Sequence, residues 1–70
     1  MLLPHQQRVV EERDQLADKV ANLRTLLYGK IFRSLSDDEQ TRLVQQLGFM
    51  EAYARILEAR IDAFEQAAEH

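Results

Sequence analysis

The chain has 70 residues, of which nine are basic and twelve acidic, giving a formal charge of −3 at neutral pH. A chain of this length forms one small domain, whose core rarely gives enough stability without a disulfide, a metal or an assembly. Cysteine is absent, which excludes disulfides and thiolate metal sites and favours an intracellular protein. The scattered, net negative charge lacks the basic surface that long nucleic acids need.

Hydropathy sets an expectation for location. The four residues before His5 are too short for the apolar part of a signal peptide. No apolar run approaches the roughly 20 residues that span a bilayer. We therefore expect a cytoplasmic protein with neither a membrane nor a long nucleic acid as partner.

The first predicted element is a helix over residues 4–28. Pro4 suits the first helical turn, because an N–H there would have no partner in the helix. No other proline or glycine occurs before Gly29, which we expect to end the helix in a left-handed conformation. Residues 29–36 are then predicted to form an irregular link.

The second predicted helix covers residues 37–68. Ser36 and Glu39 have the spacing of a capping box, and Asp37 and Asp38 place negative charge near the positive end of the helix dipole. Gly48 is the one interruption, with a cost of roughly 1 kcal/mol relative to alanine.

Apolar residues recur at heptad-like spacing in both predicted helices, with Arg13 at one position of the first. They are Val9, Leu16, Val20, Leu23 and Leu27 in the first helix, and Leu43, Leu47, Met50, Ala54, Leu57, Ile61, Phe64 and Ala68 in the second. Two such seams joined by a short link predict an all-α fold. We expect one domain over residues 1–70, a two-helix antiparallel hairpin of coiled-coil character.

A second stripe runs beside the seam of the later helix and would face water in a lone hairpin. It consists of Gln46, Phe49, Tyr53, Ile56, Arg60 and Ala63. We expect it to join hairpins into a homo-oligomeric helical bundle, with Phe49, Tyr53, Ile56 and Ala63 at the interface. A hairpin that docks on a different protein would present the same stripe.

Residues that could carry chemistry are few. No nucleophile with a base, metal cluster or carboxylate pair occurs at a telling spacing, so we predict neither an enzyme nor a cofactor. His5 and His70 stand near the two ends of the chain. Two histidines without a nearby seam carboxylate make a poor metal site, and we predict no metal.

The open end of the predicted hairpin is a candidate ligand site. Arg8 and Arg60 would lie near the N–H groups at the start of the first helix, where His5 stands, and together these groups could bind an anion. The ring of Tyr53, two turns further along, could stack on a base. Alternatively, Glu12 could join Arg8 and Arg60 in a solvated salt-bridge cluster. The sequence leaves both interpretations open.

The order of residues adds a resemblance that runs from Pro4 to Phe64. It is carried by Pro4-His5-Gln6-Gln7-Arg8-Val9-Val10, then Glu12, Leu16, Lys19 and Leu23, then Phe32, Leu35, Glu39, Arg42-Leu43, Gln46, Met50, Tyr53, Ile56-Leu57, Arg60-Ile61 and Phe64. In these residues the chain resembles a family of small phage and prophage proteins labelled as related to a crAssphage gene product.

A looser likeness is architectural. The expected form is similar to phage proteins that inhibit the CBASS and Thoeris defences, which include small helical hairpins that assemble and sequester cyclic nucleotides. The likeness implies a phage-encoded, non-enzymatic oligomer in the host bacterial cytoplasm that sequesters a nucleotide-derived immune signal, with a small cyclic nucleotide as candidate ligand. The alternative function is an inhibitor or adaptor that docks on a host protein.

Overall fold

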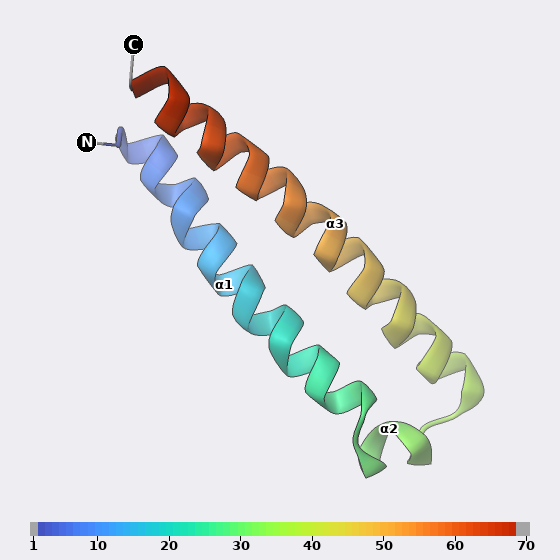
Figure 1. Cartoon of the computed structure of the whole chain (residues 1–70). Helices are drawn as coiled ribbons and strands as arrows, with labels where there is room; N and C mark the ends of the chain where they lie inside the picture. The colour runs from blue at the N-terminus through green and yellow to red at the C-terminus, as the bar shows by residue number, and fades with distance from the viewer. Residues whose placement is uncertain (1, 69–70) are drawn as a thin grey trace.

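The computed structural model describes residues 2–68, and its regular structure is helical (Figure 1). The helices are α1 (Pro4–Leu27), α2 (Lys30–Ser34) and α3 (Asp37–Ala68). Within residues 2–68 there is no strand, so the all-α class predicted from the sequence is confirmed. No helix in this part of the chain is both long and apolar enough to cross a bilayer.

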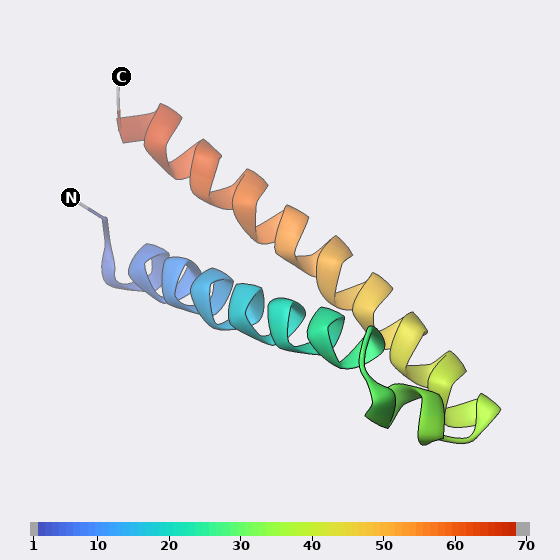
Figure 2. The same ribbon diagram turned by 60° about the horizontal axis from the view of Figure 1, so that its bottom comes forward.

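The two long helices lie side by side and run in opposite directions, while α2 turns the chain between them (Figures 1 and 2). The start of α1 and the end of α3 therefore lie at the same end of the molecule. The whole is a rod with principal extents of 52 × 16 × 14 Å. Its radius of gyration is 15.8 Å, whereas a compact chain of this length has about 11 Å. Much of each helix consequently faces solvent.

The core is a single row of apolar side chains between α1 and α3. The buried members are Val9, Leu16, Val20, Leu23, Leu57 and Ile61, and Leu57 alone among them has no exposed surface. Val10, Leu47, Met50, Ala54 and Phe64 are partly buried around this row. The core therefore uses the seam of each long helix and leaves the outer faces unpacked.

Local hydrogen bonds explain where the long helices begin. Before α1, the N–H of Leu3 donates to Oε1 of Gln6 at 2.9 Å, which holds the chain at the entry to Pro4. Before α3, the hydroxyl of Ser36 accepts the N–H of Glu39 at 3.2 Å. The carboxylate of Glu39 pairs with Arg42 instead, at 3.4 Å. Ser36 is thus the N-cap predicted for the second helix.

Two local predictions at the turn are wrong. Gly29 has φ −97° and ψ 174°, an extended conformation, because a new helix starts directly after it and Gly29 serves as its N-cap. The segment after Gly29 is also helical, as α2, rather than irregular. The side-chain amide of Gln40 donates to the carbonyl oxygens of Phe32 and Leu35, at 3.0 and 3.1 Å, and so ties α2 to α3.

Candidate functional site

The contact between Tyr53 and Glu12 is the centre of the candidate site. Tyr53 lies on α3 and Glu12 on α1, and the tyrosine hydroxyl donates a hydrogen bond to the Glu12 carboxylate. Both residues flank the core rather than belong to it: Glu12 precedes the seam position of Arg13, and Tyr53 precedes that of Ala54. The bond therefore spans the two long helices along one edge of the rod.

The surroundings of Tyr53 are electrostatically mixed. Its hydrogen bond to Glu12 raises the pKa of Tyr53 above its usual 10.0, and partial burial and the negative charge of Glu12 act in the same direction. The positive charge of Arg60 lowers the pKa of Tyr53. Arg60 is therefore close enough to act on the phenol. The side chain of Tyr53 stays 42% exposed, so its ring is open to a ligand.

Arg8 stands on the same side of α1 as Glu12, four residues earlier and hence one helical turn away. The exposed side chains of Arg8 and Arg60 enter no ion pair within residues 2–68, where the paired arginines are Arg13, Arg24 and Arg42. Glu12 bonds Tyr53 rather than either arginine. Within residues 2–68, Glu12 therefore forms no salt-bridge cluster with Arg8 and Arg60, which was the alternative interpretation of the sequence. We call Arg8, Glu12, Tyr53 and Arg60 the tyrosine face.

Of the two histidines expected near this end of the hairpin, the structure describes His5. His5 is an exposed residue in the first turn of α1, next to the tyrosine face in sequence. His70 lies outside the described residues. Between residues 2 and 68 no group of three or more histidine, cysteine or carboxylate side chains is arranged to hold a metal ion.

The opposite edge of the rod is bridged by ion pairs. Arg24 bonds Glu51 at 2.5 Å, and Arg13 bonds both Glu58 at 3.2 Å and its neighbour Asp14 at 2.7 Å. These bonds raise the pKa of Arg13, with the bond to Asp14 as the largest cause. Arg13, the charged residue in the seam of α1, is therefore paired with carboxylates. The two edges differ: this one has paired charges, whereas the tyrosine face has two exposed arginines.

The residues predicted for an oligomer interface lie on the solvent side of α3. Phe49 is 76% exposed and Ile56 57% exposed, and Ala63 is exposed as well. Tyr53 lies between this apolar surface and α1, so it belongs to the tyrosine face as well as to the predicted stripe.

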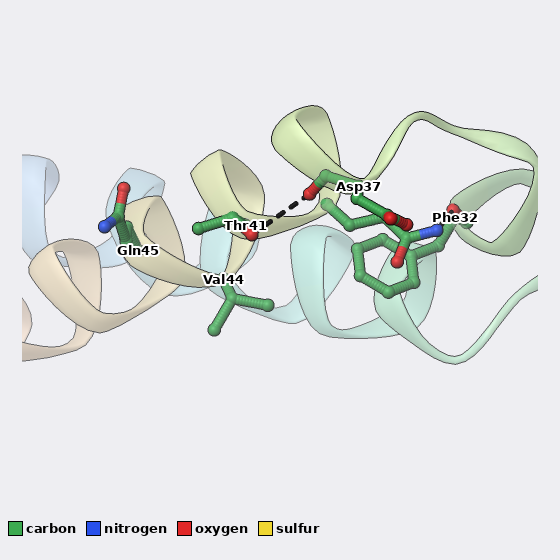
Figure 3. Close-up of a pocket in the computed structure, with 6 residues that line it drawn as sticks. Phe32, Asp37, Thr41, Val44 and Gln45 are labelled. Carbon is green, nitrogen blue, oxygen red and sulfur yellow. Dashed lines mark hydrogen bonds between the residues drawn. The ribbon is translucent and has the colours of Figure 1, made fainter.

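A groove at the turn was missed by the sequence reasoning (Figure 3). It has a volume of about 430 Å³ and is lined by Phe32, Asp37, Gln40, Thr41, Val44 and Gln45. The Thr41 hydroxyl donates to the Asp37 carbonyl oxygen at 3.0 Å, so this hydroxyl is already hydrogen-bonded within α3. The available signal was Val44, an apolar residue outside the seam. No residue predicted to bind ligand lines this groove.

Comparison with known proteins gives the chain a family. The family model described as Sequestin matches residues 3–63. The chain is also 41% identical, over 63 residues, to the "Uncharacterized 7.5 kDa protein in denB-rIIB intergenic region" of Enterobacteria phage T4, a match that covers 90% of this chain and 98% of that protein. No solved structure matches. The resemblance to small phage proteins is thereby supported, and the chain belongs to the Sequestin family.

Proposed function

We propose that this chain is a phage-encoded, non-enzymatic protein that assembles with its own copies and sequesters a small nucleotide-derived immune signal. One observation carries the proposal: the Tyr53 hydroxyl joins α3 to Glu12 of α1, the exposed Arg60 lies close to this phenol, and the exposed Arg8 lies one helical turn before Glu12. The family name Sequestin points to sequestering, and the relative from phage T4 fits a phage origin.

The charges of the tyrosine face suggest how such a ligand would lie. Guanidinium groups bind phosphate oxygens through paired hydrogen bonds, so Arg8 and Arg60 would take the phosphate. The Glu12 carboxylate would repel a phosphate placed beside Tyr53. We therefore expect the phosphate toward the start of α1 and the base against the ring of Tyr53, where stacking is sequence-tolerant.

Assembly completes the proposal because a single helix pair offers only an edge. Small-molecule sites usually bury most of their ligand, about 70–90% of its surface. An exposed edge cannot do this, whereas two or more hairpins of coiled-coil character packed together could cover the ligand from both sides. The exposed Phe49 and Ile56 are the apolar residues available for that packing.

A depletion experiment tests sequestration. The purified protein is mixed with a filtered small-molecule extract of cells in which a nucleotide-signalling defence is active, and the signal left in solution is assayed with the defence effector. Heating the mixture should then denature the protein and restore the signal, because bound ligand is released intact. A signal that stays absent after heating would mean that the protein destroys it.

Two arginine variants connect depletion to the tyrosine face. Arg60→Ala should lose most of the depletion, by at least tenfold in the protein concentration required, since one charge-assisted phosphate contact contributes about 1.5–3 kcal/mol. Arg33→Ala removes another exposed arginine, from α2, and should deplete like the unaltered protein. Equal depletion by both variants would rule out Arg60 as a ligand contact.

The exposure of Phe49 and Ile56 also favours a second function, a module that docks on a host protein as an inhibitor or adaptor. Such a module would bind no nucleotide, and its partner would be lost on Phe49→Ala while Arg60→Ala had little effect. The depletion experiment separates the two functions, since only the first removes signal from the extract.

A further inference from the structure

The side of α3 that faces away from α1 carries its own heptad pattern. Residues recur there at alternating steps of four and three and face solvent, Ala52 being half-buried: Gln45, Phe49, Ala52, Ile56, Ala59 and Ala63. We call this set the outer seam. Within it lies a shallow hollow lined by Gln45, Gly48, Phe49 and Ala52. Sustained three–four spacing of apolar residues is the pattern that pairs one helix with another.

The exposed area of the chain is larger than that expected for a compact monomer of the same mass. The chain exposes 5508 Å², whereas a compact monomer of its mass, 8.2 kDa, exposes about 4,500 Å². The excess is about 1,000 Å², close to the roughly 800 Å² per partner that a stable protein interface buries. A single helix pairing along the outer seam could bury an area of this order.

The sizes of the side chains in the outer seam indicate which helix could pair with α3 and in which relative direction. If α3 meets an antiparallel copy of itself centred level with Ala54, Phe49 faces Ala59 of the other copy and Ile56 faces Ala52. Gln45 then faces Ala63. Every layer thus joins one larger and one small side chain, which is how packed helices interdigitate.

A parallel pairing in register gives poorer packing. It would set Phe49 against Phe49 and Ile56 against Ile56, and it would leave layers of alanine alone between them. It would also bring together the acidic first turns of α3, where Asp37 and Asp38 stand. Helix dipoles oppose a parallel arrangement as well.

We infer that α3 pairs with α3 of a second copy, antiparallel, through the outer seam. The inference rests on the assembly contained in the proposed function and names its interface. Its consequence concerns the tyrosine face. The two-fold axis of an antiparallel helix pair lies perpendicular to the plane that contains both helices. Rotation about this axis leaves the corresponding flanks of the two copies on the same side of that plane. Tyr53 and Arg60 of both copies therefore lie on the same surface, where each copy adds residues to the ligand site of the other.

The absence of cysteine makes the pairing directly testable. Gln45→Cys and Ala63→Cys are prepared as two single variants, both at exposed positions outside the core. Each variant alone, and an equimolar mixture of the two, is treated with a short thiol crosslinker. The antiparallel pairing predicts crosslinked dimers in the mixture, joining one chain of each kind, and only traces in either variant alone.

The other results would overturn the inference. Efficient crosslinking of each single variant with itself means a parallel pairing. No crosslinking in any sample means that the outer seam is not an interface between copies, whatever other proteins bind it. Ala21→Cys, a cysteine at an exposed position of α1 away from the outer seam, is the control and should stay uncrosslinked. No ligand enters this experiment, so its failure is distinguishable from a failure to sequester a nucleotide.

Discussion

The hydrogen bond from Tyr53 to Glu12 gives the tyrosine face a measurable signature. Because the folded state favours the protonated phenol, this bond stabilises the protein fully below the unfolded pKa of about 10.0. That contribution is lost as the pH rises through the higher pKa of the folded state. Stability should therefore fall above pH 10 more steeply in the unaltered protein than in Tyr53→Phe, as followed by thermal unfolding across alkaline pH.

The titration itself can be observed in a chain that keeps one tyrosine. Tyr28→Phe removes the other, whose side chain is almost fully exposed, so phenolate absorbance then reports Tyr53 alone. Adding Glu12→Gln should lower the midpoint toward the ordinary value, since the carboxylate is the main cause of the shift. An unchanged midpoint would mean that the bond does not form in solution.

The sequence drew attention to Arg8, Glu12, Tyr53 and Arg60, but it did not predict the contact between Glu12 and Tyr53. Spacing on α1 suggested that Glu12 would pair with Arg8, one turn away, and such spacing describes only neighbours on one helix. The partner that Glu12 has, Tyr53, depends on the rotation of α3 relative to α1. That rotation is set by packing of the whole seam, including the fully buried Leu57.

The individual helices were more accessible to sequence reasoning than the turn. Pro4 and Ser36 predict the starts of α1 and α3, because the preferences for proline in the first turn and serine at the N-cap depend only on neighbouring residues. The helix α2 has five residues, too few to show periodicity, and its attachment depends on Gln40 from the next helix. Gly29 is extended because it caps α2, so its conformation could not be predicted without predicting α2.

Gly48 gives a prediction for α3. It stands inside the helix, and a Cβ added there would meet nothing within 4 Å. Gly48→Ala should therefore raise the free energy of unfolding by about 0.5–1 kcal/mol, the difference in helix propensity. Urea unfolding at a fixed protein concentration measures it.

The same substitution at Gly29 is the matched comparison. Gly29 is the N-cap of α2, where alanine is a poorer residue than glycine. Gly29→Ala should be neutral or slightly destabilising. A loss of stability in Gly48→Ala would show that this part of α3 is not helical or that the glycine is needed for a close contact.

The whole molecule is a thin rod, and the activity proposed for it depends on assembly. Its core is one row of side chains, and within residues 2–68 the outer seam on α3 faces solvent rather than another helix. The composition predicts that a single copy lacks a sufficient core, because 70 residues without cysteine rarely form one. The number of copies in the proposed assembly does not follow from composition, since it depends on the angles at which the outer faces meet.

Native mass spectrometry tests the claim that an assembly of this chain holds a nucleotide-derived signal. The protein is purified from cells with an active nucleotide-signalling defence and from matched cells without one. We predict an oligomer with an even number of copies in both samples, carrying an extra mass of nucleotide size only in the first. A bare monomer in both samples, or a complex with a host protein alone, would contradict the claim.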